Sequence, residues 1–121
     1  MEKAVILVVD DDPRNIFALT AVLRAKSFRC ISATGALEAI AVLKANSEVN
    51  AILLDMMMPE MDGYEAIPLI KSIPAHTNTL LVAVTAQAMV GDREKCLEAG
   101  ADAYISKPVD VDKLLQLLRS L

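Results

Sequence analysis

The sequence is poor in aromatic side chains: it has no Trp, two Tyr and two Phe among its 121 residues. Surfaces that bind bases or sugars by stacking need such rings, so no stacking platform is expected. Basic residues are also in the minority, with 12 Lys and Arg against 16 Asp and Glu and a formal net charge of -4 at pH 7. A domain with this charge has no general attraction for a polyanion, and we expect no direct contact with nucleic acid.

Cysteine is scarce, and long hydrophobic runs are missing. Cys30 and Cys96 stand far apart in no metal-binding or redox motif, which argues against a disulfide scaffold and a zinc site. The longest apolar runs, such as Ala4–Val9, are far shorter than the ~20 residues that cross a bilayer. The first residues also lack the layout of a signal peptide. We therefore expect a cytoplasmic protein with no direct membrane contact.

What the sequence has is a regular alternation of two kinds of segment. Hydrophobic residues make up 55 % and charged residues 23 %, as expected for one folded domain of this length. Short apolar runs rich in β-branched residues predict strands at Ala4–Val9, Arg29–Ala33, Ala51–Leu54, Leu80–Val84 and Ala103–Ile105. Segments with helical spacing lie between them. The alternation predicts an α/β fold, a doubly wound parallel sheet with helices on both faces.

Local signals mark several helix ends. Asp12 followed by Pro13 predicts an N-cap with proline in the first turn, and Gly100 predicts a left-handed C-cap. Pro68 interrupts a segment that otherwise has helical character, so we expect that helix to begin late or to kink. His76 lies in a polar connection and is expected to be exposed. Met56–Met58 are expected to pack at a strand end.

Polar residues with one kind of chemistry follow the predicted strands. Asp10 and Asp11 come directly after the first strand, Asp55 after the third, Thr85 ends the fourth, and Lys107 follows the fifth. In an open parallel sheet, ligands bind outside the carboxyl ends of the strands. All five residues are predicted to lie at that edge.

The residue types at this edge indicate phosphate chemistry. Carboxylates held close together repel one another, and a hard divalent cation relieves that repulsion. Ligation by oxygen alone favours Mg²⁺ or Ca²⁺ over zinc, and Mg²⁺ commonly joins one or two carboxylates to a phosphate. Lys107 and Thr85 would complete an anion site. This pattern predicts attack of the Asp55 carboxylate on phosphorus, which gives an acyl phosphate.

Five ordered motifs resemble the receiver domain of two-component response regulators. They are Ile6–Asp12, Leu53–Pro59, Met61–Gly63, Val84–Ala86 and Ser106–Pro108. The stretch Gly91–Asp102 is most similar to receivers attached to hybrid sensor histidine kinases. The resemblance covers the whole chain and implies that residues 1–121 form a single receiver domain. It implies a chemotaxis-regulator-like, flavodoxin-like (βα)5 three-layer sandwich whose five-stranded parallel sheet has the order 2-1-3-4-5.

The resemblance also implies roles for the acidic residues. Asp55 would be the phosphoacceptor. Asp11 and Asp55 would bind Mg²⁺ directly, together with the main-chain carbonyl of Met57. Asp10 would act mainly through metal-bound water.

The remaining roles concern the phosphoryl group and the switch. Thr85 would hydrogen-bond a phosphoryl oxygen and Lys107 would ion-pair with the phosphate. Tyr104 matches the aromatic position that turns inward when Thr85 is drawn towards the phosphate. The Lys107–Pro108 bond is usually cis in this family, and the positions of Met57 and Gln87 tune how water reaches the acyl phosphate.

The implied function is that of a phosphoacceptor in a two-component phosphorelay. The phosphoryl donor would be a sensor histidine kinase or a histidine phosphotransfer protein. Phosphorylation would switch the face formed by the fourth helix, fifth strand and fifth helix for a downstream protein target or a homodimer. Such a domain is not an enzyme in the usual sense, although it catalyses its own aspartyl phosphorylation and dephosphorylation with Mg²⁺. Both a stand-alone regulator and a receiver from a longer hybrid kinase stay open.

Three alternative functions fit parts of this pattern. A phosphohydrolase of the haloacid dehalogenase type would need an aspartate two residues after the nucleophile, where this chain has Met57. A flavodoxin-like FMN carrier would need Ser, Thr and Gly after the first strand, where this chain has Asp10–Asp12. A protein-binding module that takes up no phosphate would not need Asp10, Asp11 and Asp55 at the same sheet edge as Lys107.

Overall fold

Strands and helices alternate along the residues that the computed structural model describes, which are 4–86 and 90–119. The strands are β1 (Val5–Val9), β2 (Arg29–Ala33), β3 (Val49–Asp55), β4 (Leu80–Thr85) and β5 (Ala103–Ser106). The helices are α1 (Pro13–Ala25), α2 (Ala36–Ala45), α3 (Gly63–Lys71), α4 (Asp92–Ala99) and α5 (Val111–Leu118), with a short 3₁₀ turn η1 (Pro74–His76) before β4. Gln87, predicted to tune water access, lies outside the described residues.

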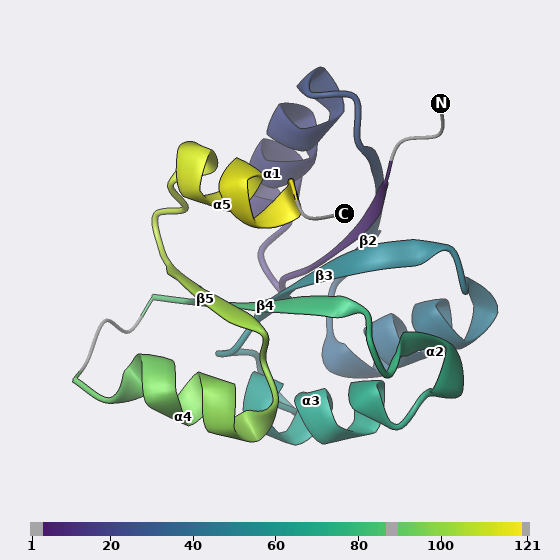
Figure 1. Cartoon of the computed structure of the whole chain (residues 1–121), viewed down its shortest axis with the longest axis vertical. Coiled ribbons are helices and arrows are strands. Elements are labelled where there is room, and N and C mark those ends of the chain that lie inside the picture. The colour runs from purple at the N-terminus through teal and green to yellow at the C-terminus, as the bar shows by residue number, and fades with distance from the viewer. Residues whose placement is uncertain (1–3, 87–89, 120–121) are drawn as a thin grey trace.

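The five strands form one parallel sheet in the order β2-β1-β3-β4-β5 (Figure 1). Both the parallel pairing and the strand order agree with the prediction. The register pairs Val9 of β1 with Leu54 of β3, so the residues that follow them, Asp10 and Asp55, lie side by side at the carboxyl edge. The register therefore brings together carboxylates that are 45 positions apart in the chain.

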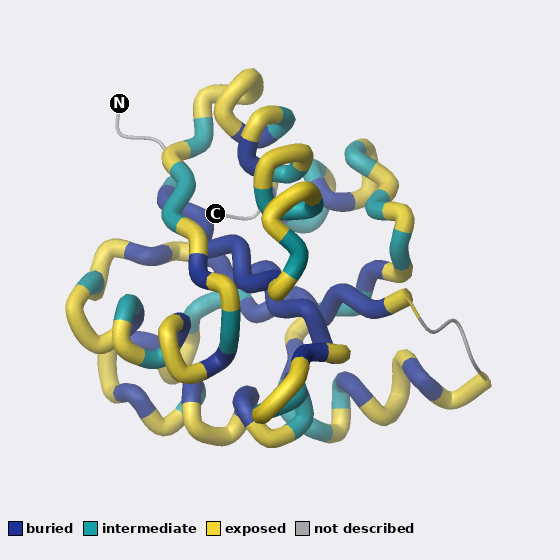
Figure 2. The backbone as a smooth tube through the Cα atoms, turned by 180° about the vertical axis from the view of Figure 1, so that it is seen from behind, coloured by how far each residue is buried: buried dark blue, intermediate teal, exposed yellow. Residues whose placement is uncertain are grey.

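Helices cover both faces of the sheet (Figure 1), because alternate strand residues point to opposite sides. Helices α1 and α5 lie on one face, where Leu23 and Leu114 pack against Ile6 and Leu53. Helices α2, α3 and α4 lie on the other. Nearly every residue of the inner strands β1, β3 and β4 is buried, and the buried segments gather in the middle of the molecule in Figure 2. This core holds the strand ends rigidly, so side chains just beyond them are well placed for a site.

Several helix ends follow the local signals. The Asp12 side chain accepts a hydrogen bond from the Arg14 amide, as an N-cap does, and Gly100 has a φ of 118° at the end of α4. The expectation that Pro68 delays the start of α3 is wrong. The helix begins at Gly63, because Asp62 caps it by accepting from the Glu65 amide, and Pro68 sits inside it on the exposed side.

His76 is buried, with 0 % of its surface exposed, and the prediction of an exposed residue is wrong. Its Nε2 lies 2.9 Å from the Leu43 carbonyl and 3.0 Å from the Asn46 carbonyl, at the end of α2. Its Nδ1 lies 2.9 Å from the Thr79 hydroxyl. The ring thus satisfies carbonyl groups that the end of a helix leaves without partners. The local sequence is polar, and only the tertiary structure brings α2 over it.

We expect His76→Ala to lower the free energy of unfolding by about 3 kcal/mol, since it leaves a cavity and buried polar groups without a partner. His76→Phe fills the volume but restores no hydrogen bond, so it should cost about 2 kcal/mol. Urea unfolding measures both values. Losses below about 0.5 kcal/mol, typical of a surface site, would contradict the buried position.

Candidate functional site

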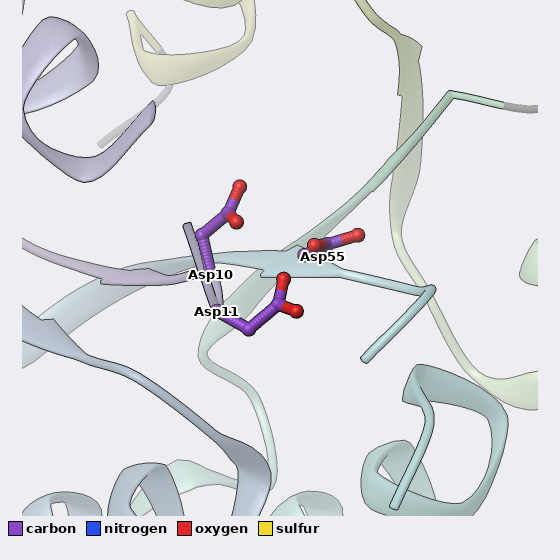
Figure 3. A group of neighbouring side chains, drawn as sticks. All are labelled: Asp10, Asp11 and Asp55. Carbon is purple, nitrogen blue, oxygen red and sulfur yellow. The ribbon is translucent and has the colours of Figure 1, made fainter. Parts of the chain in front are cut away.

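Three carboxylates meet at the carboxyl edge of the sheet, as Figure 3 shows. Asp10 and Asp11 follow β1, and Asp55 ends β3. Each can offer one oxygen such that all three atoms lie within 4.8 Å of one another. Asp10 and Asp55 are buried and Asp11 is exposed, so the group opens to solvent on one side. The structure therefore brings together the three acidic residues that the sequence predicted.

Lys107 supplies the positive charge at this edge. Its ammonium lies 3.1 Å from Oδ2 of Asp10 and 3.5 Å from Oδ2 of Asp55. Burial of the ammonium opposes its charge, but the hydrogen bond to Asp10 and the charge of Asp55 outweigh burial and raise the pKa of Lys107 above its ordinary value. Lys107 is therefore a permanent cation between two acids. The Lys107–Pro108 peptide bond is cis, in agreement with the resemblance.

The carboxyl group of Asp55 has a raised pKa. Only 3 % of its surface is exposed, and burial is the main reason that its pKa rises to about 6. The charge of Asp10 raises the pKa of Asp55 further. Two contacts lower it: the Met57 amide, which donates to Oδ1 at 3.0 Å, and the Lys107 ammonium. A bound cation would therefore stabilise the charged form of Asp55 beside Asp10.

The loop after Asp55 is held in place by a close contact. The Gly63 amide donates to the Met56 carbonyl at 3.1 Å, and a Cβ at position 63 would lie 2.9 Å from the Met56 Cα. Glycine is therefore required at this point. Met56 and Met58 are buried, as predicted, whereas Met57 is half exposed beside the acids.

Thr85 and Tyr104 lie on the neighbouring strands β4 and β5. Thr85 is buried at the end of β4, and its carbonyl accepts a hydrogen bond from the Lys107 amide at 2.7 Å. Tyr104 is half-buried, and its hydroxyl donates to Asp92 of α4 at 3.1 Å. Asp92 also accepts a hydrogen bond from Tyr64 of α3 at 3.1 Å. The predicted switch residues thus lie between the acidic site and α4.

The donor set fits a hard cation. Asp10, Asp11 and Asp55 offer carboxylate oxygens without nitrogen or sulfur ligands, as Mg²⁺ and Ca²⁺ require. The buried negative charges exceed the single positive charge of Lys107. With a cation bound, Lys107 and Thr85 at the border of the site would offer an ammonium and a hydroxyl to a tetrahedral anion beside the Asp55 oxygen.

Residues 6–119 match the family model described as the response regulator receiver domain. The chain belongs to this family. The resemblance to the receiver family is thereby confirmed, and it holds over nearly the whole chain rather than around the acids alone.

Relatives and solved structures agree with this assignment. The sensor histidine kinase RcsC of Salmonella typhi is 39 % identical over 118 residues, which are 97 % of this chain and 12 % of that protein. The receiver domain of the Pseudomonas aeruginosa sensor histidine kinase PA1611, with magnesium coordinated in its active site cleft, is 32 % identical. That match has a TM-score of 0.88 and covers 98 % of this chain and 96 % of the other.

A third structure shows a receiver with a partner. It is the co-crystal structure of the Saccharomyces cerevisiae phosphotransfer signaling protein Ypd1 and the receiver domain of its downstream response regulator Ssk1. The match has a TM-score of 0.85 and 26 % identity, and covers 95 % of this chain and 86 % of the other. This chain spans about one eighth of the length of the curated RcsC and BarA kinases.

The structure adds Asn15, Asp92 and Tyr64, which the sequence did not single out as site residues, and it gives the N-cap residue Asp12 a contact with Asp10. Asn15 of α1 lies 3.4 Å from Oδ2 of Asp10, and Asp12 donates its amide to Oδ1 of Asp10 at 2.9 Å. Asp92 and Tyr64 form the contacts described above. An asparagine or aspartate in the first turn of a helix is common for local reasons, so nothing in the sequence marks these as part of a site.

No helix within residues 4–86 and 90–119 is long and apolar enough to cross a membrane.

Proposed function

We propose that residues 1–121 act as a phosphoacceptor receiver domain in which Asp55 takes a phosphoryl group from a phosphohistidine. The donor is a sensor histidine kinase or a histidine phosphotransfer protein. The observation that carries the proposal is the meeting of Asp10, Asp11 and Asp55 with Lys107 at one sheet edge of a receiver fold. The two free cysteines are compatible with a reducing compartment, and we propose the cytoplasm.

In the proposed reaction, an Oδ atom of Asp55 attacks the phosphorus of phosphohistidine. A P–O bond forms, the P–N bond breaks, and the electron pair of that bond goes to the imidazole nitrogen. Mg²⁺ would be held by Asp10, Asp11, Asp55 and the Met57 carbonyl. When bound, it would neutralise negative charge on the phosphoryl group. Lys107 neutralises a further phosphoryl oxygen, and the Thr85 hydroxyl donates to another.

The same groups support the switch. Phosphorylation adds about 1.5 to 2 negative charges at Asp55. Lys107 and Thr85 then move towards the phosphoryl oxygens, and Tyr104 turns into the space that Thr85 leaves. This converts a charge at the sheet edge into a changed surface on α4, β5 and α5, where a downstream protein or a second copy of the chain binds.

Acetyl phosphate with Mg²⁺, followed by intact mass, tests the proposal. We expect the wild-type protein to gain one phosphate, and Asp55→Asn to gain none. Asp112→Asn, which changes an exposed acid on α5, is the matched control and should behave as wild type. Chelation of Mg²⁺ should abolish the gain. A phosphate that still appears on Asp55→Asn would disprove Asp55 as the acceptor.

A further inference from the structure

The Asp92 carboxylate joins three elements of the fold. It is nearly buried, with 9 % of its surface exposed, and lies in the first turn of α4. Its Oδ1 accepts from the Tyr64 hydroxyl of α3 and its Oδ2 accepts from the Tyr104 hydroxyl of β5, each at 3.1 Å. Buried hydrogen bonds to a carboxylate are among the stronger ones in proteins, so this contact fixes how α4 sits against its neighbours.

Few other side chains of α4 anchor it. Asp92 and Cys96 are the two buried residues of the helix, and the Cys96 sulfur lies 3.7 Å from the Tyr64 hydroxyl. Lys95 places its ammonium 4.9 Å from the centre of the Tyr64 ring. The two tyrosine hydrogen bonds to Asp92 therefore attach the N-terminal turn of α4 to α3 and β5.

Tyr104 shares a face of the sheet with Thr85. The register pairs Tyr104 with Ala83, and Thr85 lies two residues beyond Ala83, so all three side chains point to the side covered by α3 and α4. β5 is an edge strand, so a ring at position 104 can also turn outward to solvent. In this structure the half-buried ring packs against the core and its hydroxyl is held by the nearly buried Asp92.

We infer that Asp92 is a positioning residue for the switch: by holding the Tyr104 hydroxyl, it favours the inward ring and couples that ring to α4. The inference rests on the proposed function, in which the inward ring occupies space that Thr85 leaves when it moves to the phosphoryl group. Because coupling between two sites is reciprocal, a residue that favours the inward ring also strengthens binding at the phosphoryl site.

Beryllofluoride with Mg²⁺, which mimics the phosphoryl group, tests the inference by NMR titration. We expect Asp92→Ala to weaken beryllofluoride binding about three- to tenfold, the equivalent of one hydrogen bond. Tyr104→Phe, which keeps the ring and removes its hydroxyl, should weaken binding equally, and the double variant no further. Asp92→Asn, whose amide can bond both hydroxyls, should stay within about twofold of wild type.

Tyr64→Phe is the matched control, because it removes the other hydrogen bond to the same carboxylate and leaves Tyr104 untouched. It should change the affinity by less than about twofold. Beryllofluoride should also shift the Tyr104 ring resonances in the wild type, and shift them less in Asp92→Ala. A carboxylate that only stabilises the fold would not produce this difference.

The outcomes separate the two claims. A wild-type protein that binds no beryllofluoride with Mg²⁺ contradicts the proposed function itself. If the wild type binds but a folded Asp92→Ala binds equally well or more tightly, the inference alone is overturned. Should Asp92→Ala fail to fold, Tyr104→Phe decides: an unchanged affinity overturns the inference.

Discussion

Replacing Lys107 with methionine is expected to slow phosphorylation of Asp55 by acetyl phosphate about 100-fold, the effect of removing one preorganised charge from an anion site. Lys107 contacts Asp10 and Asp55 at 3.1 and 3.5 Å, and both acids are almost fully buried. Without the ammonium, one positive charge fewer offsets the repulsion between the buried carboxylates and an incoming phosphoryl group. The initial rate of mass gain at saturating Mg²⁺ measures the effect.

Lys107→Met should also destabilise the protein, by about 2 kcal/mol at pH 8, because it leaves buried carboxylates without their partner. Lys71→Met is the matched control. The Lys71 side chain is 21 % exposed against 22 % for Lys107, and it forms its own ion pair with Asp102 at 3.0 Å, away from the acidic site. Lys71→Met should lose stability and keep the wild-type phosphorylation rate. Equal rates for the Lys107 variant and the wild type would remove Lys107 from the proposed reaction.

Asp55→Asn is expected to stabilise the metal-free protein at pH 8 by about 2 kcal/mol, although it abolishes phosphorylation. Burial raises the pKa of Asp55 from 3.8 to about 6, with the charge of Asp10 adding to the rise. A shift of this size corresponds to about 3 kcal/mol. Because asparagine also weakens the contact with Lys107, we expect a smaller net gain, which urea unfolding without Mg²⁺ measures.

The stability that Asp55→Asn gains over the wild type should increase with pH. The folded state holds a proton on Asp55 more tightly than the unfolded state does, so the contribution of Asp55 to stability is most favourable below pH ~4. It falls as the pH rises towards 6 and is fully unfavourable above the folded pKa. The advantage of Asp55→Asn should therefore be near zero at pH 4 and reach its full value at pH 8.

Two controls accompany this measurement. Glu48→Gln changes an exposed acid far from the site and should alter stability by less than about 0.5 kcal/mol at either pH. Mg²⁺ should stabilise the wild type by mass action and stabilise Asp55→Asn much less. A variant less stable than the wild type at pH 8 would show that the cost of burying the charged Asp55 carboxylate is not the dominant effect.

Prediction from sequence worked best where the signal is local or follows from strand direction. The strands were predicted to within about two residues, because continuous apolar runs are typical of strands buried on both faces. Asp10, Asp55 and Lys107 could be placed at one edge because the strands of a parallel sheet all end on the same side. The prediction at Pro68 was wrong: α3 begins at Gly63 although proline removes a hydrogen bond, because Asp62 caps the helix and Ile67 and Ile70 pack in the core.

The sequence alone determined the parallel α/β architecture, the edge that carries the site, and the acids and lysine gathered there, since periodicity and strand ends are properties of short segments. Only the tertiary structure decided that His76 is buried beneath the end of α2 and that Asp92 joins Tyr64 to Tyr104. Those contacts link segments that are distant in the chain. Their side chains have the same local surroundings in sequence as ordinary surface residues, so the packing of one element on another is what gives them their role.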